Sequence, residues 1–541
     1  MLSVYCICYR KLSREEVFIL RIDKWIILWA FLYFPSLLFA QVDTVWVRRY
    51  NGAGNAEDRV RACAVDTGGN VYITGRSIGS GTAFDYATIK YSPNGDTIWV
   101  RRYNGTGNNL DEPFAIKVDT AGNVYIAGRS YGGATFFDYA TIKYGPAGDT
   151  LWVRRYNGTG NALDRANALA VDKNGNVYVT GESWRGTSSD YATIKYNPNG
   201  EIIWIRYYDG PAAGEDRAYA LAVDDSGHVY VSGESIGNGS FYDYATIKYN
   251  SNGDTLWAKR YNGIANGDDA AYALETDKNG NVYVTGISTG SGTSFDYVTI
   301  KYNNYGDTLW VKRYNGTGNY WDQPNFLSVD TAGNVYVTGS SYGTGSFEDY
   351  ATLKYNSGGS SSWTKTYNGP QNNSDFAYAL TVDDSGYIYV TGCSDCYTPF
   401  CDYTTICYSP NGDSLWVQRY NGTGDSIDIA SAVVLDGIGN FYVAGTSIGS
   451  GSSFDFVTIK YGSGQNLCLA KPGDANGDSN LGLSDIVTII NYLFKGQAAP
   501  SPLCPGDGNA DGKILLSDII YLVNFLFKSG PAPVKSGACC L

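Results

Sequence analysis

The stretch "DYATIKYNPNG", from Asp190 to Gly200, decides the fold because close variants of it occur eight times along the chain. The Asp that opens each copy lies 52 or 53 residues from the next one. These positions are Asp85, Asp138, Asp190, Asp243, Asp296, Asp349, Asp402 and Asp455. A repeat of this length indicates one supersecondary unit that is used many times, each copy packing against its neighbours.

Each repeat unit contains four strand-like pieces, which we name a, b, c and d. In the second unit they are Phe114–Asp119, Asn123–Gly128, Asp138–Tyr144 and Asp149–Gly158. Each piece is rich in Val, Ile, Tyr, Thr or Trp and is bounded by Gly, Asn, Asp or Pro, as strands between tight turns are. Four short strands in about 40–50 residues are typical of a propeller blade.

The two ends of the repeat region decide the number of blades. The region opens with a lone d piece, Asp43–Gly52, and closes with a, b and c pieces over 432–461 that lack a d piece. Each piece therefore occurs eight times, and the first d piece completes the last blade. We predict an all-β, eight-bladed β-propeller over residues 41–462, closed by its N-terminal strand, because closure removes open sheet edges.

Units such as "ALAVDKNGNVYVTGESWRGTSSDYATIKYNPNG" resemble the SBBP-type beta-propeller repeat of exported bacterial proteins. The resemblance covers residues 43–461 and implies a fold without implying a particular activity. The family name implies seven blades, whereas the pieces of this chain count eight.

Two Asp residues recur in every blade. The first ends piece a, and we predict that it holds the a–b turn together with a following Gly; the alternative is a calcium ligand. The second lies eight residues earlier, where we expect it to bond its own loop; the alternative is a ring of carboxylates that holds cations near the axis. The first set is Asp66, Asp119, Asp172, Asp224, Asp277, Asp330, Asp383 and Asp436, and the second is Asp58, Asp111, Asp164, Asp216, Asp269, Asp322, Asp375 and Asp428.

The N-terminal segment contains an apolar run, Trp25–Ala40, that follows Arg21 and Lys24. This pattern predicts a signal peptide over residues 1–40 with cleavage before Gln41, and hence a secreted or cell-surface bacterial protein. About the first twenty residues are interpreted as a gene-start artefact. The alternative is a membrane anchor, although the run is shorter than the ~20 residues that a span needs, and no later segment is long and apolar enough. The net charge of −13 disfavours a nucleic-acid partner.

The loops of the repeat differ in length on the two faces of the ring. In a four-stranded meander the a–b and c–d turns share one face, and the b–c and d–a loops share the other. The second set is longer and more varied, so we predict that this face binds a glycan or a protein. Its aromatic and basic exceptions are Trp184, Arg185, Tyr320 and Trp321, for which the alternative is packing between blades.

The sequence gives little support for catalysis. The only His, His228, occupies an a–b turn site, so a Ser–His–Asp arrangement has no second candidate base. We therefore predict a protein without catalytic residues.

One blade carries a cluster of cysteines, "CSDCYTPFCDYTTIC", beginning at Cys393. In an exported protein we favour two disulfides across one hairpin, Cys393–Cys407 and Cys396–Cys401, because their index sums are nearly equal. The alternative is a metal site.

The C-terminal part contains two twelve-residue loops, Asp474–Asp485 and Asp507–Asp518, each followed by an apolar helix pattern. Asp or Asn at positions 1, 3 and 5, a carbonyl at 7 and Asp at 12 supply the hard oxygen ligands that Ca²⁺ prefers. Two such loops in tandem predict two calcium ions.

This pair, over residues 473–533, closely resembles a type I dockerin, which implies a cohesin-type protein partner. Residues 463–472 are then a linker, and residues 534–541 a tail. The chain departs from the pattern at Ser479, Gly482 and Leu515, and its partner-reading positions are Leu-Ser in both loops. The resemblance implies as ligands Asp474, Asn476, Asp478, Asn480, Asp485, Asp507, Asn509, Asp511, Lys513 (through its carbonyl) and Asp518.

Together these features predict an exported, non-catalytic binding or scaffold protein that docks through a calcium-dependent module. One rival is a glycan-active enzyme in polysaccharide catabolism that is tethered through the dockerin-like end. Another is a structural component of a surface layer.

Overall fold

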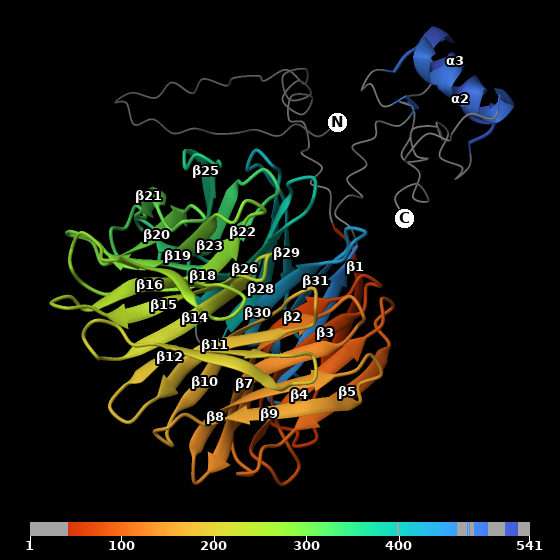
Figure 1. Ribbon diagram of the computed structural model, residues 1–541. Helices are drawn as coiled ribbons and strands as arrows, with labels where there is room; N and C mark the ends of the chain where they lie inside the picture. Colours follow the sequence, from red (N-terminus) through yellow and green to blue (C-terminus); the bar gives the residue numbers. More distant parts are fainter. Residues whose placement is uncertain are drawn as a thin grey trace, which may run out of the picture. The chain divides into compact units, whose positions relative to one another are not determined.

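The computed structural model describes residues 42–397, 400–462, 473, 475–476, 481–495 and 514–528. Within them the chain forms eight four-stranded antiparallel sheets arranged as the blades of a propeller (Figure 1). The predicted all-β eight-bladed fold is confirmed. The predicted signal peptide, linker and tail lie outside the described residues.

We number the blades I to VIII in chain order of their a strands. Blades I to IV are β2 (Asp58–Val65), β3 (Val71–Ile78), β4 (Phe84–Tyr91), β5 (Thr97–Tyr103); β6 (Asp111–Val118), β7 (Val124–Gly133), β8 (Phe136–Tyr144), β9 (Thr150–Tyr156); β10 (Asp164–Val171), β11 (Val177–Trp184), β12 (Ser189–Tyr196), β13 (Ile202–Tyr208); and β14 (Asp216–Val223), β15 (Val229–Ile236), β16 (Tyr242–Tyr249), β17 (Thr255–Tyr261). Blades V to VIII are β18 (Asp269–Thr276), β19 (Val282–Thr289), β20 (Phe295–Tyr302), β21 (Thr308–Tyr314); β22 (Asp322–Val329), β23 (Val335–Tyr342), β24 (Glu348–Tyr355), β25 (Ser361–Tyr367); β26 (Ser374–Val382), β27 (Ile388–Tyr397), β28 (Phe400–Tyr408), β29 (Ser414–Tyr420); and β30 (Asp428–Leu435), β31 (Phe441–Ile448), β32 (Phe454–Tyr461) with β1 (Thr44–Tyr50).

The ring closes through its N-terminal strand. Strand β1 pairs antiparallel with β32, with Val47 opposite Ile459, so that the first strand becomes the outer strand of blade VIII. Each a strand contacts the a strand of the next blade, and β30 contacts β2 in the same way. The sheet edges of the first and last repeats are therefore joined, as predicted.

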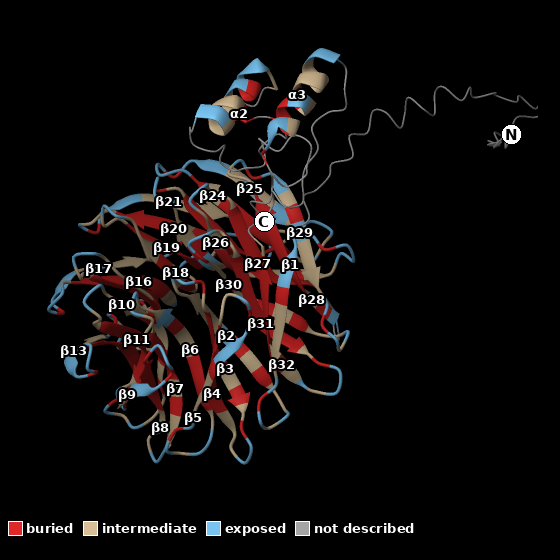
Figure 2. Ribbon diagram, turned by 90° about the vertical axis from the view of Figure 1, so that its right-hand side faces the viewer, coloured by how far each residue is buried: buried red, intermediate tan, exposed pale blue. Residues whose placement is uncertain are grey.

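The quoted stretch also explains how neighbouring blades adhere. Its c–d turn accepts hydrogen bonds from the preceding blade: Trp152 Nε1–H and Lys143 Nζ both donate to the Pro198 carbonyl, at 3.0 and 3.2 Å. Arg154 Nε–H donates to the Gly200 carbonyl at 2.6 Å. Strands b and c are buried along nearly their whole length, because each packs against the blades on both sides (Figure 2). The same repeated motif thus forms the strands of its own blade and accepts hydrogen bonds from the neighbouring blade.

Both recurring Asp residues bond backbone groups, as expected. At the a–b turn of blade III, Asp172 Oδ1 accepts from the N–H groups of Asn174 and Asn176, both at 2.9 Å. At the start of β10, Asp164 Oδ2 accepts from Gly158 N–H at 2.6 Å and Oδ1 from Trp184 N–H at 3.1 Å. The second Asp therefore ties the d–a loop to the end of strand b.

The described part of the C-terminal region contains two helices, α2 (Leu483–Lys495) and α3 (Leu516–Lys528), which contact each other. They share a small core of Ala475, Ile486, Ile489, Ile514, Ile519 and Leu522. The apolar helix faces predicted from the sequence are thus the buried ones. Most of the two preceding loops lies outside the described residues.

One of the two predicted disulfides is present. A disulfide joins Cys396 to Cys401, but Cys393 and Cys407 are free thiols, and that predicted bond is wrong. The b–c register places Cys393 opposite Tyr403 and Cys407 opposite Tyr389. Four residues of strand separate Cys407 from the partner position of Cys393, about 13 Å at 3.3 Å per residue. The sum of residue numbers that predicts the Cys393–Cys407 pair differs by four from the sum for residues that are partners in the observed register.

Candidate binding face

The long d–a and b–c loops of the ring are held together at one face by the second recurring Asp. Between blades V and VI, Asp322 Oδ2 accepts from Gly316 N–H at 2.6 Å and Oδ1 from Tyr342 N–H at 3.1 Å. Thr344 N–H donates to Thr317 Oγ1 at 3.0 Å, and Thr344 Oγ1 donates to the Thr317 carbonyl at 2.7 Å. These bonds fix the d–a loop before β22 against the b–c loop of blade VI.

A shallow pocket lies between these two loops. Its volume is about 550 Å³. The backbone approaches closely there, because a Cβ on Gly318 would lie 2.7 Å from the Tyr342 carbonyl oxygen. The lining residues are Thr317, Gly318, Tyr320, Tyr342, Gly343, Thr344 and Gly345.

Two aromatic side chains, Tyr320 and Tyr342, line this pocket, and Trp321 follows Tyr320 in the chain. The Tyr320 ring is 56% exposed and meets the Tyr342 ring edge-on, with centroids 5.0 Å apart. Trp321 is 40% exposed; its ring packs edge-on against Phe295, and its Nε1–H donates to Gln323 Oε1 at 3.2 Å. We call Tyr320, Trp321 and Tyr342 the aromatic patch. Its rings are oriented by neighbours while part of their surface remains open to a ligand.

The other two predicted residues of this face are engaged locally in blade III. Arg185 stacks on the Tyr207 ring, 4.2 Å from its centroid, and pairs with Asp190 at 3.3 Å. Trp184 covers Gly160, where an added Cβ would lie 2.3 Å from the Trp184 ring. Both residues thus have contacts within blade III and the loop before it, and the Arg185 side chain is still 40% exposed. The structure therefore places Tyr320 and Trp321 at the patch and does not join them with Trp184 and Arg185.

An arc of buried charge lies where strands a begin and strands b end, at the same face of blades I to IV. Glu112 is 1% exposed and pairs with three arginines, Arg61, Arg76 and Arg129, the last two at 3.1 and 2.8 Å. Burial alone would raise the pKa of Glu112, but the three guanidinium groups lower it below its ordinary value. The corresponding second positions of strand a in blades V to VIII are Ala270, Gln323, Phe376 and Ile429. The charged half of the ring thus differs from the half that carries the aromatic patch.

Sequence reasoning missed Tyr342 and this charged arc. Tyr342 ends strand b, and its place beside Tyr320 depends on the loop bonds made by Asp322. The arc had a signal, because Arg59, Glu112, Arg165 and Arg217 occupy one position of the repeat that is uncharged in the other four blades. Of these four, only Glu112 and Arg217 pair across blades, Glu112 with Arg61 and Arg76 and Arg217 with Glu182, and this pairing follows from the ring.

Two groups of described side chains have metal-ligating atoms within 4.8 Å of one another: Cys393, Cys396 and Cys401, and Asp190, Asp209 and Asp216. The first group includes the disulfide, and Asp190 of the second already pairs with Arg185. Of the predicted calcium ligands, the structure describes Asn476, Asp485 and Asp518, and the remaining seven lie outside the described residues. Asp485 and Asp518 are both fully buried.

His228 lies at an a–b turn on the opposite face. Its Nδ1 is 2.9 Å from Asp224 Oδ2, and its backbone N–H donates to Asp224 Oδ1 at 2.9 Å. The residue occupies the place that Asn176 takes in blade III, where Asn Nδ2–H donates to Asp172 Oδ2 at 2.7 Å. His228 therefore acts as a turn residue.

Comparison with known proteins agrees with the geometry. Three stretches of the chain match the SBBP beta-propeller repeat. They are residues 98–133, 151–185 and 309–348. Each stretch runs from the outer strand of one blade through strands a and b of the next, so it spans the junction between two blades. These SBBP repeats include Trp184 and Arg185 as well as the whole aromatic patch.

An uncharacterized WD repeat-containing protein, L264 of Acanthamoeba polyphaga mimivirus, is 24% identical over an alignment of 421 residues that covers 65% of this chain. The matched region is only 28% of the length of that relative. Chaetomium thermophilum Sqt1, solved bound to the N-terminus of the ribosomal protein L10, is similar with a TM-score of 0.51 at 10% identity, over 77% of this chain and 99% of that one. Drosophila Plexin A, solved in complex with Semaphorin 1b, gives a TM-score of 0.38 at 10% identity, over 77% and 87%. At 10% identity, the likeness to Sqt1 shows the fold alone.

Proposed function

We propose that this protein is an exported, non-catalytic binding or scaffold protein whose propeller recognises a glycan or a protein on its long-loop face. The observation that carries the proposal is the aromatic patch, in which Tyr320 and Trp321 remain 56% and 40% exposed although both rings are held by neighbours. A β-propeller is a rigid scaffold suited to binding proteins or other ligands through its loops.

The chemistry of the patch favours recognition over catalysis. Tyr and Trp offer large, rigid contact areas at low entropic cost and dominate many binding sites. The groups beside them are Thr hydroxyls and Gly backbone, without a carboxylate, an imidazole or a thiol in the pocket lining. Such a surface presents aromatic rings and hydrogen-bonding groups, and the two Tyr hydroxyls are the titratable side-chain groups of its lining.

The proposal is tested by applying the propeller, residues 42–462, to arrays of polysaccharides and of peptides and measuring which of them retain it. We expect retention of one chemical class and no release of soluble product from any polysaccharide. Release of shortened sugars would contradict the non-catalytic assignment and favour the glycan-active alternative. An absence of retention on both arrays would contradict recognition of either class.

We further propose that the C-terminal helices belong to a dockerin-like module that folds around two Ca²⁺ and docks to a cohesin-type domain. In support, the last acidic residue of each loop is fully buried and turns back toward that loop. Asp485 accepts from Asn476 N–H at 3.2 Å and from Gly482 N–H at 2.8 Å, and Asp518 accepts from Leu515 N–H at 2.7 Å. Buried carboxylates in this position fit a hard cation.

Docking is tested by titrating the full chain with a type I cohesin domain in the presence of calcium and of EDTA. We expect binding only with calcium. The double variant Asp485→Ala, Asp518→Ala should lose binding even with calcium. Lys495→Ala, a change of an exposed residue in the last turn of α2, is the control and should bind as the wild type does. Equal binding with EDTA would contradict the calcium role.

A further inference from the structure

The b–c hairpin of blade VII holds three cysteines close together. Cys396 is bonded to Cys401 across the hairpin, and Cys393 precedes Cys396 by three residues on the same strand, β27. Asp395 adopts a positive φ of 57°, and the strand register shifts between Ser394 and Tyr397. This bulge turns Cys396 back toward Cys393.

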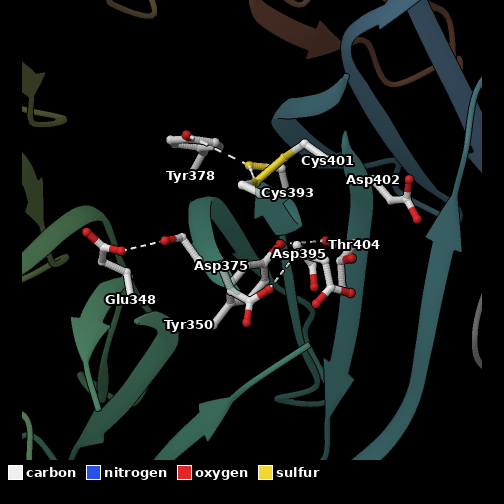
Figure 3. The surroundings of a disulfide bond; sticks show 12 residues. Glu348, Tyr350, Asp375, Tyr378, Cys393, Asp395, Cys401, Asp402 and Thr404 are labelled. Carbon is white, nitrogen blue, oxygen red and sulfur yellow. Dashed lines mark hydrogen bonds between the residues drawn. A yellow bond between two sulfur atoms is a disulfide. The ribbon is translucent and has the colours of Figure 1, made fainter. Parts of the chain in front are cut away.

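The free thiol lies in contact with the disulfide. Cys393 Sγ is 2.8 Å from Cys396 Sγ, and the three sulfur atoms all lie within 4.8 Å of one another (Figure 3). Non-bonded heavy atoms ordinarily rest about 3.5–4.0 Å apart, so Cys396 is within bonding reach of either neighbour after a small movement. The fourth cysteine, Cys407, takes no part, because the register places it opposite Tyr389.

We propose that Cys393, Cys396 and Cys401 form a thiol–disulfide exchange centre, in which one disulfide moves between Cys396–Cys401 and Cys393–Cys396. In the step, the Cys393 thiol loses its proton, and its sulfur attacks Cys396 Sγ. The Cys396–Cys401 bond breaks, and its electron pair leaves on Cys401, which takes up a proton. One bond is exchanged for another, so no oxidant or reductant is consumed.

Exchange removes the covalent link between the two strands of the hairpin. The Cys396–Cys401 bond links β27 to β28, whereas a Cys393–Cys396 bond lies within β27 alone. The hairpin is then held by its backbone ladder and by Arg419, which pairs with Asp395 on one strand at 2.7 Å and with Asp402 on the other at 3.0 Å. The strand ends that carry Tyr397 and Phe400, which are 71% and 52% exposed on the long-loop face, are then no longer joined by a disulfide.

The surroundings of Cys393 make the exchange sensitive to pH. The thiol is 1% exposed, and burial raises its pKa to about 12. The titratable groups that face it are Tyr378, 4.0 Å away, and Asp375, both on β26, with Tyr350 on β24. Because the thiolate is the attacking species, its small fraction at neutral pH makes exchange slow there and faster as pH rises.

The proposal is tested on the full chain with excess iodoacetamide at pH 7, 8 and 9, followed by acid quenching and non-reducing peptide mapping. Cleavage before Asp395 and after Tyr397 separates the three cysteines. We expect alkylated Cys401 together with a Cys393–Cys396 disulfide, formed at an initial rate that rises up to about tenfold per pH unit. Cys393→Ser should abolish alkylation of Cys401, and the matched control Cys407→Ser should not.

Three outcomes would overturn the proposal. The first is a wild-type map with the Cys396–Cys401 disulfide and no Cys393–Cys396 disulfide at any pH. The second is alkylation of all three cysteines, which would show that no disulfide is present. The third is equal alkylation of Cys401 in Cys393→Ser. The first two need only the wild-type protein, so they stand even if the variant fails to fold.

Discussion

Truncation of Trp46 tests the closure of the ring through its N-terminal strand. Trp46 is 7% exposed in β1 and packs against Tyr91 of blade I and Tyr442 of blade VIII, each with ring centroids 6.0 Å away. Its Nε1–H donates to the Pro93 carbonyl at 3.0 Å. One side chain of the first strand thus joins the last blade to the first, and Trp46→Ala should loosen this junction.

The magnitude follows from burial. Removal of a buried Trp side chain costs about 3–5 kcal/mol. For about 420 residues the entropy of unfolding is roughly 0.9 kcal/mol per degree, so the melting temperature should fall by about 3–6 °C. The neighbouring Val45 is 54% exposed on the same strand, and Val45→Ala should change the melting temperature by less than about 1 °C.

Scanning calorimetry of both variants beside the wild type provides the measurement. Equal shifts for Trp46→Ala and Val45→Ala would refute the placement of β1 in blade VIII. A loosened β1 also uncovers the edge of β32, so we expect Trp46→Ala to aggregate earlier during heating than Val45→Ala.

Three further predictions concern pH, calcium and the a–b turns. Burial raises the pKa of Asp164, Asp216, Asp269 and Asp349 to about 6, against ~3.9 in the unfolded chain. Because the folded protein holds these protons more tightly, protonation of the four carboxyls stabilises the fold. This stabilisation is complete below pH ~4 and is lost as pH rises through ~6. The propeller should melt higher at pH 5 than at pH 7.5, with a smaller difference in Asp164→Asn; a lower melting temperature at pH 5 would contradict this. Circular dichroism of the full chain with EDTA should show loss of helical signal while the β signal of the propeller persists, and unchanged helicity would count against calcium-dependent folding. Asp119→Ala removes the acceptor of four hydrogen bonds, from Ala121 N–H, Asn123 N–H, Asn123 Nδ2 and Tyr125 Oη, and should destabilise blade II by about 2–4 kcal/mol in denaturant unfolding, whereas the exposed Lys173→Ala should stay within about 0.5 kcal/mol.

Much of the fold was predictable because each blade repeats the same sequence pattern of strands and turns. The c piece predicted at Asp138–Tyr144 corresponds to β8, Phe136–Tyr144, and the d piece at Asp149–Gly158 to β9, Thr150–Tyr156. The a piece predicted from Phe114 begins three residues earlier, at Asp111. Glu112 and Pro113 are poor strand formers, and they are held in β6 by the pairing of the Glu112 carboxylate with three arginines and by the pairing of β6 with β7.

The candidate site was only half predictable. The exposure of Tyr320 and Trp321 follows from their long loop, but nothing local distinguishes them from Trp184, which packs on Gly160. The cysteines show a similar limit. The b–c register places Cys393 and Cys407 four residues apart, and a bulge at Asp395 shifts the register by one residue where Cys396 is bonded to Cys401. Register and loop packing are set by tertiary contacts that the repeat pattern does not encode.

The most direct test of the binding face compares Tyr320→Ala with Tyr305→Ala on whichever polysaccharide or peptide the arrays retain. Tyr305 is 78% exposed at the c–d turn of the same blade V, on the opposite face, so it matches Tyr320 in chemistry but not in position. Removal of a central aromatic contact should weaken binding at least about tenfold, measured by titration calorimetry, in Tyr320→Ala, while Tyr305→Ala binds as the wild type does. Unchanged affinity in Tyr320→Ala, or a loss confined to Tyr305→Ala, would contradict the assignment of ligand binding to the long-loop face.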